Sequence, residues 1–297
     1  MRGRRTEAAA SVEPHRLTVL FILGAGHSGS TLLNLLFNAH SEAIGLCEVH
    51  AIHRFLSFPD DDPRNPLHQK LWRDVATCWT GKTGIPFREI DIHTPRRRQL
   101  RAWGDDQVDA YVDHNMALLD CVARVSGARV IVDSSHNRWR LLVMSRSAAI
   151  DLRVVHVIRD GRAVVNSYSR KYQSLGVGLR RWLIPTALAL AMRPLVDVPW
   201  VRVRYEDLAS RPESVLEDLC EFAGLEFEPG MVRYWEHEDY SIGGNRMRRS
   251  KRPVKLDERW QSELSTGSRV AVGLLGGWLN WLCGYSPLAR YRRRPTS

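Results

Sequence analysis

The chain has 297 residues, of which 44% are hydrophobic and 26% are charged, proportions that are ordinary for a soluble globular protein. This length suits one large domain with a substantial core, and two complete domains would be a tight fit. The formal net charge of +10 favours anionic ligands, acidic polymers or anionic membranes. However, all but 5 of the 43 basic residues are arginines, an imbalance that genome composition also produces, so charge alone selects no partner.

The two ends of the chain are basic. Residues 1–16 predict a disordered tail, because no continuous apolar segment follows the first arginines as it would in a signal peptide. Residues 291–297 predict a second basic tail, which leaves residues 17–290 as a single domain. No stretch approaches the ~18–20 apolar residues of a membrane-spanning helix. The cysteines are odd in number and widely spaced, which predicts reduced thiols and a cytoplasmic protein, without a disulfide framework or a zinc site.

The first predicted strand, at residues 17–23, leads into the glycine-rich segment Gly24–Thr31, and a predicted helix follows to residue 38. This segment nearly matches the phosphate-binding loop (P-loop) pattern G-x-x-x-x-G-K-[S/T], with Ser30 in place of the lysine. A strand, a glycine-rich turn and a helix N-terminus direct backbone N–H groups at one point, which suits a phosphate. Without the lysine, the pattern indicates an anion site that does not cleave ATP or GTP.

Strands and helices are predicted to alternate along the rest of the chain. A second short strand ends near Leu46. Residues 58–107 predict an irregular or short-helical insertion, which would cover an acceptor, that is, a second substrate bound beside the anion site. Further strands are expected at 128–132, 152–158 and 200–204, with helices at 105–125 and 212–222. This alternation predicts an α/β fold, a P-loop-containing three-layer α/β/α arrangement with a central parallel sheet.

Two apolar segments leave alternatives open. Residues 270–283 are interrupted by glycines and short, which favours a packed terminal helix over a membrane anchor. Residues 182–190 are flanked by arginines and predict either a core helix or an interfacial helix that meets a lipid-like acceptor.

A second anion site is predicted where the strand at 152–158 runs into Arg159-Asp160-Gly161-Arg162. An arginine at the carboxyl end of a strand lies where α/β sheets bind ligands, and its guanidinium can form paired hydrogen bonds to a phosphate. Ser167 follows two helical turns later, and Arg170 and Lys171 share that face. Together the two sites indicate a ligand with two anionic groups. On spacing alone, an arginine that caps a salt-bridged helix is an equal alternative.

The two segments resemble those of sulfotransferases that use 3′-phosphoadenosine 5′-phosphosulfate (PAPS). The 5′-phosphosulfate loop of that family, (K/R)-S-G-(T/S)-T-x-L, corresponds to residues 27–33, and its 3′-phosphate segment, R-D-G-R-A-x-x-x-S, corresponds to residues 159–167. Five more segments follow in the family's order, at 38–48, 132–135, 203–208, 244–248 and 257–260. The resemblance is to bacterial members of the carbohydrate or tyrosyl-protein type.

The resemblance implies sulfuryl transfer from PAPS, without a metal, to a hydroxyl of a carbohydrate, glycolipid or other small acceptor. It implies that Glu48 takes the proton of the acceptor hydroxyl, with Asp133 and His50 as alternatives. His27 and His136 stand where many members have arginine or lysine. We expect His27 to stabilise charge at the leaving oxygen or to act there as a general acid, with Arg252 or His136 adding positive charge. The residues expected to bind the donor are Gly26, His27, Ser28, Gly29, Ser30, Thr31, Leu32, Arg159, Ser167, Tyr205, Asn245 and Arg252.

The basic segment 243–252, which begins with two glycines, is expected to close over the donor as a lid. Two other classes of function stay open. One is a P-loop kinase or NTPase, which Ser30 disfavours, and the other is a non-catalytic binder of polyanions or nucleic acid, which only the charge suggests, since no nucleic-acid-binding motif is present. The acceptor and the oligomeric state are not predictable, and contact with a membrane surface is a further expectation.

Overall fold

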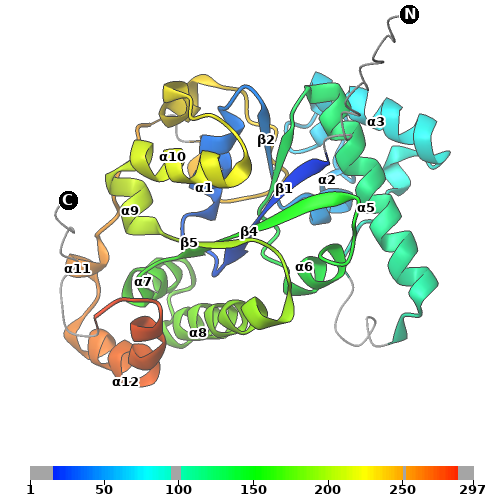
Figure 1. Ribbon diagram of the computed structural model, residues 1–297. Helices are drawn as coiled ribbons and strands as arrows, with labels where there is room; N and C mark the ends of the chain where they lie inside the picture. The colour runs from blue at the N-terminus through cyan, green and yellow to red at the C-terminus, as the bar shows by residue number, and fades with distance from the viewer. Residues whose placement is uncertain (1–15, 95–101, 250–251, 287–297) are drawn as a thin grey trace, which may run out of the picture.

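A computed structural model of the chain describes residues 16–94, 102–249 and 252–286. Its centre is one sheet of five parallel strands in the order β2-β3-β1-β4-β5 (Figure 1). The strands are β1 (Leu17–Gly24), β2 (Ala43–Cys47), β3 (Val130–Asp133), β4 (Ile150–Ile158) and β5 (Trp200–Arg204). The predicted α/β fold with a parallel sheet is confirmed. The predicted basic tails, apart from Arg16, lie outside the described residues.

Helices cover both faces of the sheet. One face carries α1 (Ser30–Asn38), α9 (Tyr205–Ser210), α10 (Pro212–Ala223) and the 3-10 segment η5 (Pro229–Glu236). The other carries α3 (Lys70–Thr83), α5 (Asp105–Ser126), α6 (Arg138–Met144), α7 (Gly161–Tyr172) and α8 (Leu175–Met192), with α12 (Thr266–Leu282) packed outside α7 and α8 (Figure 1). The short helices α2 (Ile52–Phe55) and α11 (Trp260–Glu263) and the turns η1 (Val49–Ala51), η2 (Pro66–His68), η3 (Phe87–Glu89), η4 (Arg193–Leu195) and η6 (Arg246–Arg249) complete the described elements.

The alternation of side chains along β1 explains the three layers. Leu20 and Ile22 point into the core beneath α1 and α10, whereas Phe21 and Leu23 point into the core beneath α3 and α5. Successive residues of a strand face opposite sides, so a strand that is apolar throughout must be covered on both. Because β1 continues into α1 on one face and β4 continues into α7 on the other, a crevice opens between their carboxyl ends, where such sheets bind ligands.

The prediction for residues 58–107 is wrong where α3 is concerned. Residues 70–83 form a regular 14-residue helix, and Trp72, Val75 and Trp79 share one buried face of it. The spacing i, i+3, i+7 is that of an amphipathic helix, and the prolines that suggest irregularity lie outside these residues. This helix packs against α5 and forms part of the main hydrophobic core. A role of this segment in covering the acceptor stays a prediction.

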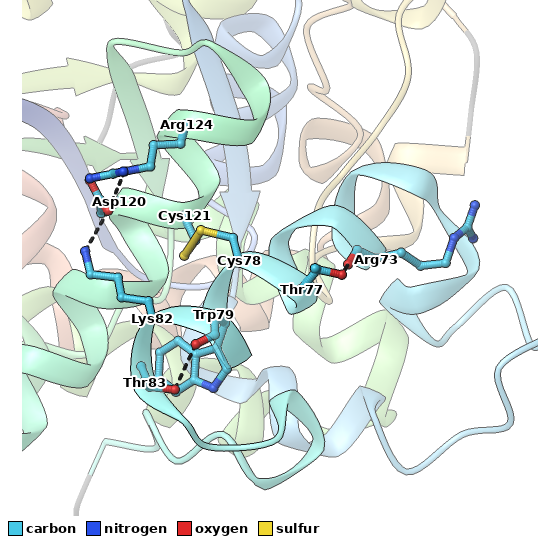
Figure 2. Close-up of a disulfide and its surroundings, with 9 residues drawn as sticks. All are labelled: Arg73, Thr77, Cys78, Trp79, Lys82, Thr83, Asp120, Cys121 and Arg124. Atoms are coloured by element: carbon cyan, nitrogen blue, oxygen red, sulfur yellow. Dashed lines mark hydrogen bonds and ion pairs between the residues drawn. A yellow bond between two sulfur atoms is a disulfide. The ribbon is translucent and has the colours of Figure 1, made fainter.

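The prediction of reduced thiols is wrong for one pair. Cys78 of α3 and Cys121 of α5 form a disulfide across 43 residues of sequence (Figure 2). The ion pairs of Lys82 and Arg124 with Asp120 lie beside it. Spacing alone could not show the pair, because it forms only through the packing of two helices. The expected cytoplasmic location, which rested on reduced thiols, therefore loses that support.

The prediction that no stretch could span a membrane also needs correction. The continuous helical segment Leu175–Leu195 is long and apolar enough to do so by length and composition, although a core helix of a globular protein meets the same criterion. A third of its most apolar window is buried in the domain. The prediction of a packed terminal helix is confirmed for α12 along one face, since Val272, Gly276 and Leu279 are buried there.

Candidate active site

The turn between β1 and α1 is shaped by close contacts that require glycine. Gly29 has a φ of 99°, and a Cβ there would lie 2.6 Å from the Tyr205 ring. A Cβ on Gly26 would lie 2.2 Å from the Tyr168 hydroxyl. At the start of α1, the Leu33 N–H donates to the Gly29 carbonyl at 3.0 Å. The N–H groups of the first turn have no acceptor within the helix, so they form an anion cradle.

A pocket of about 420 Å³ lies over this cradle, where β1 and β4 end. It brings together residues from both predicted anion sites, more than a hundred positions apart. Its lining consists of His27, Gly29, Ser30, Thr31, Arg159, Ser167, Arg170, Lys171, Tyr205, Asn245, Met247, Asp257 and Arg259. Hollows of about 770 and 830 Å³ lie at the amino-terminal edge of the sheet and beside α3, away from both predicted anion sites. Parallel sheets bind ligands at their carboxyl edge, which favours the smaller pocket.

Arg159 connects three parts of the pocket. Its guanidinium donates to the His27 carbonyl at 3.0 Å and to the Asp257 carbonyl at 2.9 Å, and it stacks 4.1 Å above the centre of the Tyr205 ring. Its Nε is buried and has no hydrogen-bond partner among the described residues. A buried donor without an acceptor is costly, so this atom fits an anionic oxygen of a ligand.

Two polar side chains contact the ring of His27 in this pocket. Ser167 Oγ lies 3.0 Å from its Nδ1, and the side-chain amide of Asn245 lies 3.4 Å from the same nitrogen. Because an amide NH₂ only donates, Nδ1 accepts and the ring proton lies on Nε2. Burial lowers the pKa of His27 to about 4, and nearby positive charges, Lys171 first, act in the same direction. An anionic ligand would raise this pKa again.

The segment after residue 242 closes one side of the pocket. Gly243 and Gly244 have φ angles of 73° and 86°, which turn the chain toward the cradle. The Asn245 N–H then donates to Thr31 Oγ1 at 3.2 Å. The predicted lid thus already contacts the P-loop. The placement of Arg252 differs from expectation: its side chain is exposed and outside the pocket lining, while its carbonyl accepts from the Tyr234 hydroxyl at 2.9 Å.

Comparison with known proteins agrees with this arrangement. Residues 20–229 match the profile of the sulfotransferase family. The chain belongs to that family. Carbohydrate sulfotransferase 1 of Danio rerio is 25% identical over 286 residues, covering 75% of this chain and 66% of that protein. Carbohydrate sulfotransferase 5 of Mus musculus is 23% identical over 324 residues, covering 90% of this chain and 80% of that protein.

Solved structures show the same fold. The sulfotransferase domain of the Synechococcus PCC 7002 olefin synthase superposes with a TM-score of 0.63 at 18% identity, covering 95% of this chain and 99% of that domain. The sulfotransferase domain from the curacin biosynthetic pathway superposes with a TM-score of 0.53 at 17% identity, covering 87% of this chain and 97% of that domain. Membership of the sulfotransferase family, which the match over residues 20–229 shows, supports sulfuryl transfer in general and disfavours the kinase and polyanion-binder alternatives.

Two further candidate catalytic residues of the sulfotransferase border the cradle. His136 Nε2 lies 2.8 Å from Ser30 Oγ, its Nδ1 is buried without a partner among the described residues, and burial lowers its pKa to about 4. Glu48 follows β2 and lies outside the pocket lining, but a Cβ on Gly243 would come within 3.3 Å of its carboxylate. Burial raises the pKa of Glu48, which moves it toward the range of a general base.

The structure removes one alternative base. Asp133 is buried and forms an ion pair with Arg140 at 2.8 Å, and it also accepts the Ser135 N–H at 2.9 Å. A carboxylate that compensates a buried guanidinium is not available to take a proton from an acceptor. His50 has a buried Nδ1 without a partner in the described part of the chain, and burial lowers its pKa to about 4.

Several predicted donor residues shape the cradle without lining the pocket. Gly26, Ser28 and Leu32 belong to this set, since none of them contributes to its lining. Met247 lines the pocket as part of the predicted lid, whereas Asp257 and Arg259 line it although the sequence assigns them no role in donor binding. The segment 257–260 is recognisable by resemblance, yet its pairing with Arg159 depends on a long irregular stretch that no periodicity reveals.

Proposed function

We propose that this sulfotransferase takes its sulfuryl group from PAPS and transfers it to a hydroxyl of a carbohydrate, glycolipid or other small acceptor. The observation that carries the proposal is the meeting of two anion sites in one pocket, where Arg159 donates to the carbonyl of His27 at a separation of 132 residues. Among the described residues, four cationic side chains and one carboxylate line that pocket: Arg159, Arg170, Lys171 and Arg259, with Asp257. A nucleotide with separate 5′- and 3′-anionic groups matches this charge.

In this proposal the cradle at residues 28–32 holds the 5′-phosphosulfate through backbone N–H groups and hydroxyls. Arg159 and Ser167 hold the 3′-phosphate, and the buried Arg159 Nε supplies a donor that has no acceptor among the described residues. The Tyr205 ring stacks against the Arg159 guanidinium and holds it in place. Asn245 closes the cradle by its bond to Thr31.

Sulfuryl transfer needs an acceptor oxygen in line with the leaving oxygen, donors on the leaving group and a base for the acceptor proton. The Nε2–H of His27, a residue of the pocket lining, is the proposed donor to the leaving oxygen, since a neutral imidazole can donate without carrying charge. Glu48, with its raised pKa, is the proposed base. In the described residues no group of three or more His, Cys, Asp and Glu side chains could hold a metal ion, and the proposed chemistry uses none.

The acceptor class rests on the two carbohydrate sulfotransferases to which the chain is similar. The test is transfer of labelled sulfate from PAPS to a panel of free oligosaccharides and glycolipids, with EDTA present. We expect label in at least one acceptor. Glu48→Gln should lower kcat by about 100-fold, the usual contribution of a general base, whereas Glu217→Gln, on the exposed side of α10, should leave it unchanged.

Failure of transfer to every acceptor, with release of labelled sulfate also absent, would contradict the donor assignment. Transfer at the wild-type rate by Glu48→Gln would leave the donor assignment intact and remove Glu48 as the base.

A further inference from the structure

The apolar surface of this protein is concentrated on two neighbouring helices. Nine large hydrophobic side chains are exposed in the described part of the chain, and eight of them lie on α8, the turn η4 after it, or α12. They are Ile184, Leu195, Val270, Leu274, Leu275, Trp278, Trp281 and Leu282, which we name the apolar face. Scattered exposed hydrophobics are normal, but six on the single 17-residue helix α12 are the mark of an interaction site.

The packing of α12 explains why this face points to solvent. Its opposite side is pressed against α8, since a Cβ on Gly276 would lie 2.3 Å from the Trp182 ring. The outer side is left open: Leu274 is 79% exposed and Trp281 is 67% exposed. Figure 1 shows α8 and α12 side by side at one edge of the molecule. A helix that is apolar on all sides but covered on only one requires a second apolar environment.

Charge indicates which environment this is. Residues 175–195 and 266–282 contain four arginines (Arg180, Arg181, Arg193 and Arg269) and no aspartate, glutamate or lysine. Arg202 lies at the end of α12, where it donates to the Leu282 carbonyl at 3.4 Å. In a two-fold contact between copies of this chain, these arginines would face one another without acidic partners. Tryptophan and arginine around an apolar centre are instead the composition that binds the headgroup region of anionic lipids.

We propose that the apolar face docks the protein onto the surface of an anionic lipid bilayer. The helices lie on the membrane and do not cross it, because Leu179 and Trp182 of α8 are buried within the domain. Trp278 and Trp281 enter the headgroup layer together with Leu274, and the exposed Arg180 and Arg193 contact lipid phosphates.

Docking brings the candidate active site close to the membrane. The Arg181 guanidinium of α8 lies 5.6 Å from the centre of the Tyr168 ring, and that ring packs against His27 at 4.3 Å. Two side chains therefore separate the docked helix from the P-loop. This consequence rests on the proposed function: a glycolipid acceptor would present its hydroxyl beside the pocket.

The experiment is co-sedimentation of the full chain with vesicles of phosphatidylcholine alone or mixed with phosphatidylglycerol. We expect binding to the mixed vesicles only, weakening as salt is added. The double variant W278S/W281S should bind at least about tenfold more weakly. R180Q/R193Q should lose about fivefold per arginine. R233Q is the control for the loss of one arginine: Arg233 is exposed on η5, which packs on the other face of the sheet, so its replacement should not produce the fivefold loss expected for each arginine of α8 and η4.

Circular dichroism verifies that each variant is folded, and all the substituted side chains are exposed. Equal binding to neutral and anionic vesicles, absence of binding, or unchanged binding of W278S/W281S would each overturn the proposal. So would a dimer, detected by sedimentation equilibrium without lipid, that W278S/W281S dissociates. Transfer to a soluble acceptor is unaffected by any of these results, so failure of docking is distinguishable from failure of the proposed function.

Discussion

Arg159 and Arg162 stand three residues apart, and their surroundings assign them different tasks. Arg159 lines the pocket and reaches the P-loop, whereas Arg162 is engaged by Asp160 at 2.6 Å and lies 4.3 Å from the centre of the Trp260 ring. The same residue type thus lines the candidate ligand pocket at one position and contacts α11 at the other.

This difference predicts the outcome of two matched substitutions. Arg159→Lys removes a guanidinium that can make paired bonds to a phosphate, so the affinity for 3′-phosphoadenosine 5′-phosphate should fall about 10- to 100-fold. Arg162→Lys should leave this affinity unchanged and lower the melting temperature instead. Calorimetry and thermal unfolding of both variants provide the measurements. Equal affinity losses in the two variants would show that Arg159 acts only through the fold.

His156 makes the stability of the protein depend on pH. It is buried in β4, neither ring nitrogen has a hydrogen-bond partner among the described residues, and burial lowers its pKa to about 4. The unfolded chain, with an ordinary histidine pKa of ~6.5, binds more protons than the folded chain between these two values. The contribution of the neutral ring is therefore complete above pH 6.5 and is lost as the pH falls toward 4.

We predict that His156→Leu, a substitution of similar volume, removes part of this dependence. Between pH 7 and pH 5 the wild type should lose about 2 kcal/mol more of its free energy of unfolding than the variant. Urea titrations at the two pH values measure the difference. Parallel losses in both proteins would mean that His156 is not the group that titrates.

At the scale of helices and strands, the disulfide fixes α3 to α5. Replacing both cysteines, as Cys78→Ser with Cys121→Ser, should lower the free energy of unfolding by about 2–4 kcal/mol, because the bond closes a loop of 43 residues in the unfolded chain. Nucleotide affinity should not change, since neither cysteine lines the pocket. Denaturant titrations with and without reducing agent provide the test, and the double variant should not respond to the reductant. An equal response would assign the effect to other groups.

The elements are predictable from sequence wherever local pattern decides them. The apolar runs of β1 and β4 and the Asp160-Gly161 start of α7 identify strand, turn and helix without any long-range information. The regular helix α3 is not predicted, because the prolines on either side of it favour an irregular segment and outweigh its amphipathic spacing. The Cys78–Cys121 bond escapes prediction because it depends on how two helices pack.

The candidate site divides in the same way. Arg159 and Ser167 belong to a sequence motif and are predictable from it, and both line the pocket. The contact of His136 with Ser30, and the engagement of Arg159 by Asp257, arise from loops that only the complete fold positions. Roles for these residues stay proposals until they are measured.

For the molecule as a whole, the structure shows where part of the positive charge that gives the chain a net charge of +10 is concentrated. Cationic side chains line the pocket at the carboxyl edge of the sheet, and four more arginines lie on the segments 175–195 and 266–282 that carry the apolar face. An anionic nucleotide and an anionic membrane would thus approach neighbouring regions of one surface, both with rates that fall as salt rises.

The proposed function requires one pocket to hold both anionic ends of the nucleotide. Calorimetric titration in EDTA with 3′-phosphoadenosine 5′-phosphate and with AMP, which differ only in the 3′-phosphate, isolates this requirement. We predict that the first ligand binds at least about 100-fold more tightly, from charge-assisted bonds that AMP cannot make. Equal affinities for the two ligands would mean that the pocket does not recognise the 3′-phosphate.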